Sequence, residues 1–237
     1  MATVTAGTFK GFTGEGIQFL TDLAQNNDRA WFQPRKGDYE RLLKEPLEAL
    51  CAALDERFRA RGIPMRPDPA KSPFRIYSDV RFAKDKSPYK TNLGAGFPWV
   101  EDGAGDMSAM HAGGGLGGYF HFQPGEMFIG GGTWQPESAT LAAWRRMVLE
   151  RNGDVHEALD DPAFVKTFGK LNGDQFRRVA AGAPADHPDV DLLKLKQLLF
   201  GHRLSDRDVK SAKLPDLITE SFVTALPVMR LLARLPA

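Results

Sequence analysis

The chain has 237 residues, of which 42% are hydrophobic and 26% are charged, and its formal net charge is +1. These values argue against intrinsic disorder, collagen and coiled coils, and they do not indicate a globally basic nucleic-acid binder. No apolar run approaches the roughly 18 residues of a membrane span, and the first residues lack the apolar core of a signal peptide. The single cysteine, Cys51, excludes an internal disulfide framework and a cysteine-cluster zinc site. We therefore expect one cytoplasmic domain over 1–237, with no cofactor and no membrane contact.

Residues 12–61 show a helical pattern of apolar residues. Thr13 is a suitable N-cap for a short first helix, which Asn26-Asn27 interrupts. Apolar residues at steps of three and four then predict a long amphipathic helix with a kink at Pro46. Arg61-Gly62 is expected to end this helix.

Residues 72–134 change to a period of two, which predicts a sheet. The segment F-R-I-Y-S-D-V-R-F (74–82) predicts a strand with one apolar and one polar face. Its apolar set is Phe74, Ile76, Val80 and Phe82, and its polar set is Arg75, Tyr77, Asp79 and Arg81. Further strands are expected at 93–97, 118–122 and 126–132. Pro124-Gly125 is predicted to join the last two as an antiparallel hairpin.

Residues 135–237 return to a helical pattern. Helices are expected to start at Pro136 and at Asp161-Pro162, to cover 188–199, and to run from about Asp216 towards the C-terminus; Ser205 and Asp208 resemble a capping box. Helices, then strands, then helices predict an α+β fold. We expect a mostly antiparallel central sheet of four to six strands, with the N-terminal and C-terminal helices packed on it.

Residues 98–117 show no helical or strand period and are rich in glycine towards their end. Such a long irregular segment within a compact domain is usually functional or disordered. We expect a flexible loop here, either a mobile flap or a surface excursion.

Familiar catalytic and metal-binding motifs are missing from the sequence. Gly113, Gly115 and Gly118 match G-x-G-x-x-G formally, but a loop precedes them and a strand follows, which is the wrong context for dinucleotide binding. No two histidines have a close metal-ligand spacing, so no metal site is expected. Cys51 lies near the apolar stripe of a helix, where a free cysteine is usually a small buried hydrophobe.

The segment R-I-Y-S-D-V-R-F-A-K-D-K-S-P-Y-K-T (75–91) is the most informative part of the chain. Residues 66–90 contain seven Lys or Arg against three Asp, a local net charge of +4. Such a cluster attracts anions, and arginine forks suit carboxylate or phosphate groups. Asp79 stands between two arginines and is suited to orient them. We predict that a small phosphate- or carboxylate-bearing ligand binds on the polar sheet face. The predicted ligand-binding residues are Arg75, Tyr77, Arg81, Lys84, Lys86, Tyr89, Lys90 and Tyr119.

Tyr119 and His121 are expected to share one face of the second strand, and therefore to join the polar row of the first. His121 and Asp79 are the candidates for proton transfer, so an enzyme and a simple binding protein both stay open.

Two other functions are compatible with the same residues. The basic strip suits docking of RNA, DNA or an acidic protein, and the polar row suits a purely structural role in an interaction domain. A concave pocket uniting the strands favours the small ligand, a flat strip favours docking, and internal ion pairs favour the structural role.

Several motifs together resemble one known family. They are F-L-x-x-L-x-x-N-N-x-x-x-W-F (Phe19 to Phe32), R-x-Y-x-D-x-R-F-x-K-D-K-x-P-Y-K-T (Arg75 to Thr91), G-Y-F-H-F (Gly118 to Phe122) and G-G-G-x-W-x-P (Gly130 to Pro136). They resemble the family called domain of unknown function 2461, which occurs in bacteria and fungi, from about Phe12 to Leu235. The chain departs from the family pattern at Arg177-Arg178 and in the Gly-rich insertion at 99–116. The resemblance implies no activity, substrate or catalytic residue.

Overall fold

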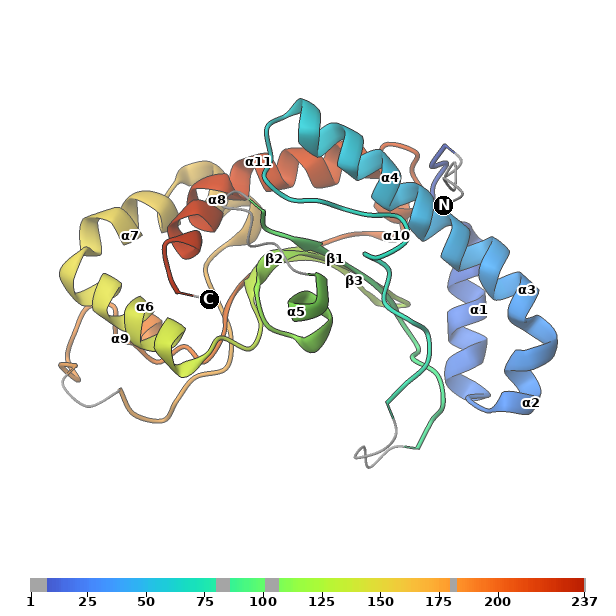
Figure 1. The fold of residues 1–237 in the computed structure, drawn as a ribbon, viewed down its shortest axis with the longest axis horizontal. Coiled ribbons are helices and arrows are strands. Elements are labelled where there is room, and N and C mark those ends of the chain that lie inside the picture. The colour runs from blue at the N-terminus through green and yellow to red at the C-terminus, as the bar shows by residue number, and fades with distance from the viewer. Residues whose placement is uncertain (1–7, 80–85, 101–106, 180–182, 237) are drawn as a thin grey trace.

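The computed structural model describes residues 8–79, 86–100, 107–179 and 183–236. It shows an α+β protein with a four-stranded antiparallel sheet in the order β1-β2-β3-β4, as the sequence predicts. The strands are β1 (Leu93–Pro98), β2 (Leu116–Gln123), β3 (Glu126–Thr133) and β4 (Leu198–Arg203). Helices cover one face of the sheet and extend beyond it at both ends (Figure 1).

The N-terminal helices begin and end where the sequence predicts. Thr13 caps α1 (Gly14–Gln25) by accepting a hydrogen bond from the Gly16 amide at 3.1 Å, and Asn26 ends that helix. The short helices α2 (Arg29–Phe32) and α3 (Lys36–Tyr39) follow, with a 3-10 turn (Gln33–Arg35) between them.

The long helix is interrupted beside Pro46. A π-helical turn (Glu40–Lys44) precedes α4 (Glu45–Ala60), so Pro46 lies in the first turn of α4. Proline lacks an amide N–H and its ring clashes with the carbonyl four residues earlier, and a widened turn removes that conflict. Gly62 adopts φ +63° directly after the helix, as a glycine C-cap requires.

The C-terminal part of the chain supplies both helices and an edge strand. Its helices are α6 (Ser138–Glu150), α7 (Asn152–Leu159), α8 (Pro162–Phe168), α9 (Val190–Leu193), α10 (Asp206–Val209) and α11 (Leu214–Ala233). The Ser205–Asp208 capping box is present at the start of α10. The predicted helix over 188–199 is wrong, because only α9 is helical and β4 begins at Leu198. Residues 135–237 are therefore not wholly helical.

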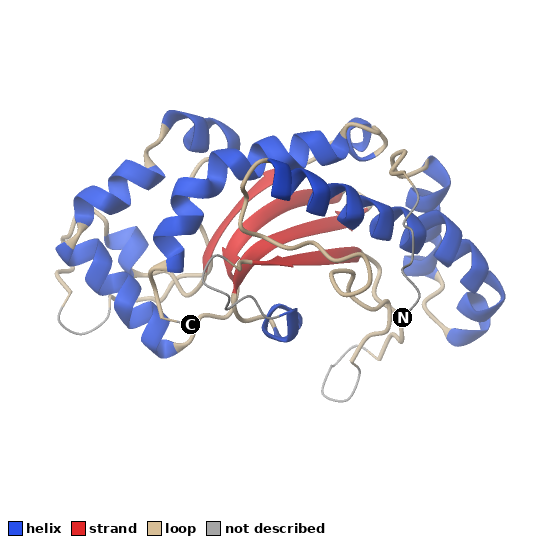
Figure 2. Cartoon of the chain, turned by 45° about the horizontal axis from the view of Figure 1, so that its top comes forward, coloured by secondary structure: helices blue, strands red, loops and turns tan. Residues whose placement is uncertain are grey.

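The main core lies between the sheet and helices α4 and α11 (Figures 1 and 2). Phe58 of α4 makes edge-to-face contacts with Phe97 of β1 and Phe222 of α11. Phe12, which precedes α1, stacks on Phe122 of β2 at 4.4 Å between ring centroids. All five rings are at most 2% exposed, so segments from both ends of the chain close one apolar layer over the sheet.

The prediction of a regular strand over 74–82 is wrong for its described residues. Residues 72–74 run along β1, where the Phe74 amide donates to the Gly94 carbonyl at 2.8 Å. The chain then leaves the sheet, and residues 76–78 pair with 88–90 instead. We call 75–79 and 86–90 the arm; it descends below the sheet on the side of α2 (Figure 1). Val80 and Phe82 lie outside the described residues.

The Gly-rich segment contains regular structure that its sequence hides. Residues 107–112 form α5 (Met107–Ala112), Pro98 ends β1 and Leu116 begins β2. The prediction of an irregular segment over 98–117 is therefore wrong at these positions. Helix α5 packs against β1, where the Met110 side chain fills the space above Gly96 and Gly117.

In the part of the chain that the structure describes, no helix has both the length and the apolar character that crossing a bilayer requires.

Candidate functional site

The sheet face opposite α4 and α11, here called the underside, carries few large side chains. Strand pairing places Gly94, His121, Phe128 and Arg203 side by side in one row across the four strands. The adjacent row contains Gly96, Tyr119, Gly130 and Gly201. Because successive side chains alternate between faces, all eight residues belong to the underside. Tyr119, His121, Phe128 and Arg203 therefore stand on a floor formed largely of glycine.

Tyr119 and His121 form a hydrogen-bonded pair at the centre of this face. The Tyr119 hydroxyl lies 3.1 Å from His121 Nδ1. Burial raises the pKa of Tyr119 to about 12, so its hydroxyl keeps its proton at neutral pH. Burial also lowers the pKa of His121, which Glu126 and Gln123 partly oppose. The pair is therefore neutral at pH 7, with the phenol suited to donate to the imidazole.

His121 Nε2 is buried and has no hydrogen-bond partner among the described residues. The side chain of Gln123 lies close enough to affect the imidazole, but it does not reach hydrogen-bonding geometry with Nε2. The ring is held flat against Phe128, with centroids 4.8 Å apart and an interplanar angle of 16°. A buried polar atom without a partner is uncommon, so this nitrogen marks a position for an additional polar group.

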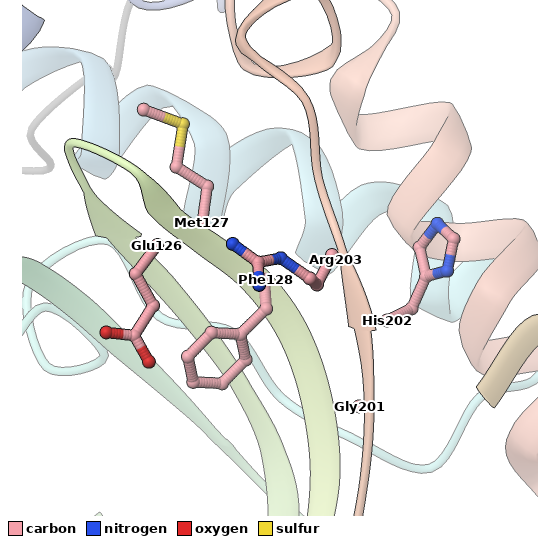
Figure 3. A pocket seen from close by; sticks show the side chains of 6 residues that line it. All are labelled: Glu126, Met127, Phe128, Gly201, His202 and Arg203. Carbon is pink, nitrogen blue, oxygen red and sulfur yellow. The ribbon is translucent and has the colours of Figure 1, made fainter. Parts of the chain in front are cut away.

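A hollow of about 210 Å³ lies beside Phe128, at the β3–β4 end of the row. Its lining comprises Glu126, Met127, Phe128, Gly201, His202 and Arg203. Figure 3 shows that Phe128 and Arg203 point to one side of the sheet, whereas His202 points to the other. Arg203 is held in place because its guanidinium donates to the Gly125 carbonyl at 2.9 Å. The hollow therefore has the Arg203 guanidinium and Phe128 in its lining, and Phe128 in turn stacks on His121.

A second group of residues covers the β1 end of the same face. Phe74 stacks on Tyr119 at 5.8 Å between centroids and makes an edge contact with His111 of α5 at 4.8 Å. Lys90 Nζ lies 5.5 Å from the centre of the Phe74 ring. Burial and the neighbouring Arg75 lower the pKa of Lys90, and none of the described carboxylates offsets this effect. Arg75 and Lys90 therefore form a cationic pair that is separated from Tyr119 by the Phe74 ring.

The arm that carries Lys90 is fixed to the N-terminal helices. Asn27 Nδ2 donates to the Tyr89 carbonyl at 2.8 Å, and Asn27 Oδ1 accepts from the Tyr89 amide at 3.1 Å. The Tyr89 ring stacks on Phe32 at 4.0 Å, and Gln33 donates to its hydroxyl at 3.4 Å. Lys90 follows Tyr89 directly, so this anchor determines where its ammonium group lies.

The structure brings four of the predicted site residues together. A series of contacts through the Phe74 ring connects Arg75 and Lys90 to Tyr119 and His121. Tyr119 and His121 share one face of β2, as predicted. Phe74 was predicted to face the main core but contacts Tyr119 on the underside instead. Its strand ends early, which breaks the alternation that placed it with Ile76.

The other predicted site residues are placed differently. Tyr89 is 2% exposed and packs in the core, so it is not available to a ligand. Tyr77 is 46% exposed and touches only the outer side of Tyr89 in ring contacts. Asp79 and Lys86 are exposed on the arm, and each has an interaction partner. Arg81 and Lys84 lie outside the described residues.

Sequence reasoning missed Arg203, Phe128 and His111. Arg203 lies on β4, which was predicted to be loop after a helix, so its place in the row with His121 was hidden. Phe128 was visible as the residue alternating with Met127 and Ile129 in its strand, a signal that could have placed it beside His121. His111 lies on α5, inside the segment predicted to be irregular.

Among the described residues, no group of three or more His, Cys, Asp or Glu side chains is arranged to hold a metal ion. The polar groups of the underside are its cations, the Tyr119–His121 pair, and Gln123 and Glu126, of which Glu126 lines the hollow.

These features define an α+β protein with a helix-covered antiparallel sheet and a polar, glycine-floored underside. The sequence profile of the family described as "Conserved hypothetical protein (DUF2461)" matches residues 15–230. The chain belongs to this family. Neither the curated proteins nor the solved structures contain a match to it.

Proposed function

We propose that the underside of the sheet binds a small anionic ligand that carries a phosphate or carboxylate group. Arg75 and Lys90 supply positive charge at the β1 end, and Arg203 supplies it at the β4 end. Tyr119 and His121 lie between them as polar contacts. The observation that carries this proposal is the buried, unpartnered His121 Nε2 between two sources of positive charge.

The protonation states favour a ligand that is an anion. A neutral His121 whose Nδ1 accepts from the Tyr119 hydroxyl carries its proton on Nε2. That N–H is a hydrogen-bond donor without an acceptor among the described residues, and an anionic oxygen is a suitable acceptor. The cationic pair of Arg75 and Lys90 is likewise relieved by an anion.

Proton transfer at the same place is the enzymatic form of this proposal. His121 is the residue to carry it: its lowered pKa keeps the imidazole neutral, and in the tautomer whose Nδ1–H donates to the Tyr119 hydroxyl, Nε2 is free to accept a proton. Asp79 is less suitable, because it lies exposed on the arm and away from the Tyr119–His121 pair. The lone buried Cys51 is free, which suits the reducing cytoplasm as the location.

The docking and structural alternatives are distinguished by the same residues. A structural row would consume its charges internally, yet neither Arg75 nor Lys90 forms an ion pair with a described carboxylate. A docking strip would place its aromatic rings outward, yet Tyr89 is buried and Tyr119 lies against Phe74, which leaves Tyr77 as the exposed ring among these three tyrosines.

Calorimetric titration with inorganic phosphate, pyrophosphate and citrate tests the proposal. We expect at least one probe to bind the native chain, and Lys90→Gln and Arg203→Gln each to weaken that binding about tenfold, the effect of losing a charged hydrogen bond of about 1.5 kcal/mol. Arg59→Gln is the matched control, because Arg59 is exposed on α4, the helix that covers the opposite face of the sheet. Absence of binding by all three probes, or equal affinity of all variants, would contradict the proposal.

A further inference from the structure

A second cationic surface lies at the exposed ring of Phe176, which contacts Arg145 of α6 and pairs with Lys194 directly after α9. Helices α6 and α9 lie together at one end of the molecule (Figure 1). Phe176 is 41% exposed, although a large apolar ring is normally buried. The Arg145 guanidinium and the Lys196 ammonium each lie 5.3 Å from the centre of this ring. Two cations therefore lie over an aromatic ring that is still partly exposed. We define the Phe176 patch as Phe176, the two cations over its ring and the basic residues beside it along the chain or its backbone partner: Arg145, Phe176, Arg177, Arg178, Lys194 and Lys196.

The backbone holds this patch in place. Gln175 pairs with Leu195 in an antiparallel bridge, with the Phe176 amide donating to the Lys194 carbonyl at 2.8 Å. Arg145 reaches across from α6, and its Nε donates to the Leu193 carbonyl at 3.1 Å. The ring and its flanking cations are consequently set in position before any partner arrives, which reduces the entropy lost on binding.

The described part of the chain offers the cations of the patch no ion-pair partner. Arg177 and Arg178 are exposed directly after Phe176. Elsewhere on the described surface many cations form ion pairs, such as Arg57 with Asp216 and Arg61 with Glu220. None of the five cations of the Phe176 patch forms an ion pair with a carboxylate in the described ranges. A partner for this surface must therefore bring its own negative charge.

We propose that the Phe176 patch binds single-stranded nucleic acid, with an unstacked base on Phe176 and phosphates on the surrounding cations. Every base has a planar face that can stack on an aromatic ring. In a single strand, the backbone phosphates lie close to that base. A duplex keeps its bases stacked inside, so its bases are not available to Phe176. An acidic peptide would neutralise the positive charges of the patch but would leave the Phe176 ring exposed. The proposal rests on residues other than those of the underside.

Fluorescence anisotropy with labelled oligo-dT and oligo-U of about 12 nucleotides tests the proposal on the full chain. We expect both probes to bind, and Phe176→Ala to weaken binding by roughly 5- to 160-fold, the range that corresponds to loss of one stacked base. Phe176→Trp keeps a stacking face and should retain binding. The double variant Arg177→Glu, Arg178→Glu should reduce both the affinity and the dependence of affinity on salt, because fewer phosphates are then neutralised.

The control is Arg29→Glu with Arg207→Glu, which changes the net charge equally at two exposed positions outside the patch. This control should bind almost as the native chain does. Three results would each overturn the proposal: no binding of either probe at low salt, Phe176→Ala binding as tightly as the native chain, or equal losses in the control and the patch variant. If poly-glutamate displaced the labelled probe as effectively as unlabelled oligo-dT, this would likewise show that Phe176 does not stack on a base.

Discussion

Asn27 binds both the amide and the carbonyl of Tyr89, 62 residues further along the chain, with its single side-chain amide. This geometry imitates the pairing of one strand with another. The contact joins the junction between α1 and α2 to the arm, and Lys90 of the candidate site follows immediately. The N-N-x-x-x-W-F and P-Y-K-T motifs, far apart in sequence, thus form one structural unit.

Replacing Asn27 by alanine should lower the free energy of unfolding by about 2–6 kcal/mol, about 1–3 kcal/mol for each of two groups. The change leaves two backbone groups of a buried residue without their partners, and such groups cost about this much each when unsatisfied. Urea unfolding monitored by circular dichroism measures the loss. Asn26→Ala is the control, because Asn26 is exposed and bonds only to Asp22 of its own helix. Equal losses in the two variants would show that the Tyr89 anchor contributes nothing.

Gly94→Ala should disturb the Tyr119–His121 pair. A Cβ at position 94 would lie 2.6 Å from the Tyr119 hydroxyl oxygen and 3.0 Å from its ring, so the tyrosine must move. Crowding of this kind typically costs about 1–3 kcal/mol. Gly153→Ala is the control: it lies in helix α7 with open space around it, and should be stabilising by about 0.4–1 kcal/mol. Thermal unfolding compares the two, and a stable Gly94→Ala protein with native Tyr119 fluorescence would be inconsistent with the packing described.

His121 should make the protein less stable in mild acid. The pKa of His121 is lowered in the folded state. At pH values between its folded-state and unfolded-state pKa, the unfolded chain therefore binds more protons than the folded chain. Stability therefore rises with pH in that window and is lost as pH falls below about 6.5, the ordinary histidine value. His121→Gln should flatten this part of the pH profile measured by urea unfolding. A His121 imidazole that titrates above 6.5 by NMR would refute the lowered pKa.

His156 should act in the opposite direction. Hydrogen bonds to Asp160 (2.7 Å) and Asp189 (3.0 Å) raise its pKa in the folded state. Its stabilising contribution is therefore complete below the unfolded value of about 6.5 and is lost as pH rises through the raised folded value. The group is largely exposed, so we expect no more than about 0.2–1 kcal/mol. His156→Gln should remove a decline in stability above neutral pH, and an unchanged profile would show that the two carboxylates are too well solvated to matter.

Local sequence patterns were sufficient for elements whose partners are close in the chain. The Thr13 cap, the Pro124-Gly125 hairpin and the Ser205–Asp208 box depend on residues within a few positions, and all are present. Strand β4 was missed because Leu192, Leu195 and Leu199 have helical spacing. The residues actually buried there, Leu198 and Phe200, alternate as in a strand. The pairing of this segment with β3, which is a non-local interaction, makes it a strand and not a helix.

The candidate site was only partly predictable for the same reason. Alternation placed Tyr119 and His121 on one face correctly, because β2 is a regular strand. It misplaced Phe74, because the chain leaves the sheet to pair with 88–90, where Asn27 and Phe32 hold Tyr89. Arg203 enters the row of His121 only through the β3–β4 register. No local pattern specifies these long-range contacts.

The imidazole nitrogens of His121, followed by ¹⁵N NMR during titration with the anion that binds tightest in calorimetry, test the central claim most directly. Our account predicts a change in the Nε2 resonance at saturation and a rise in the pKa of His121, because a bound anion favours the charged imidazolium. Lys90→Gln should shift this response to higher anion concentration. An Nε2 resonance that stays unchanged while the anion is bound would place the ligand elsewhere and contradict the assignment of the underside as the binding site.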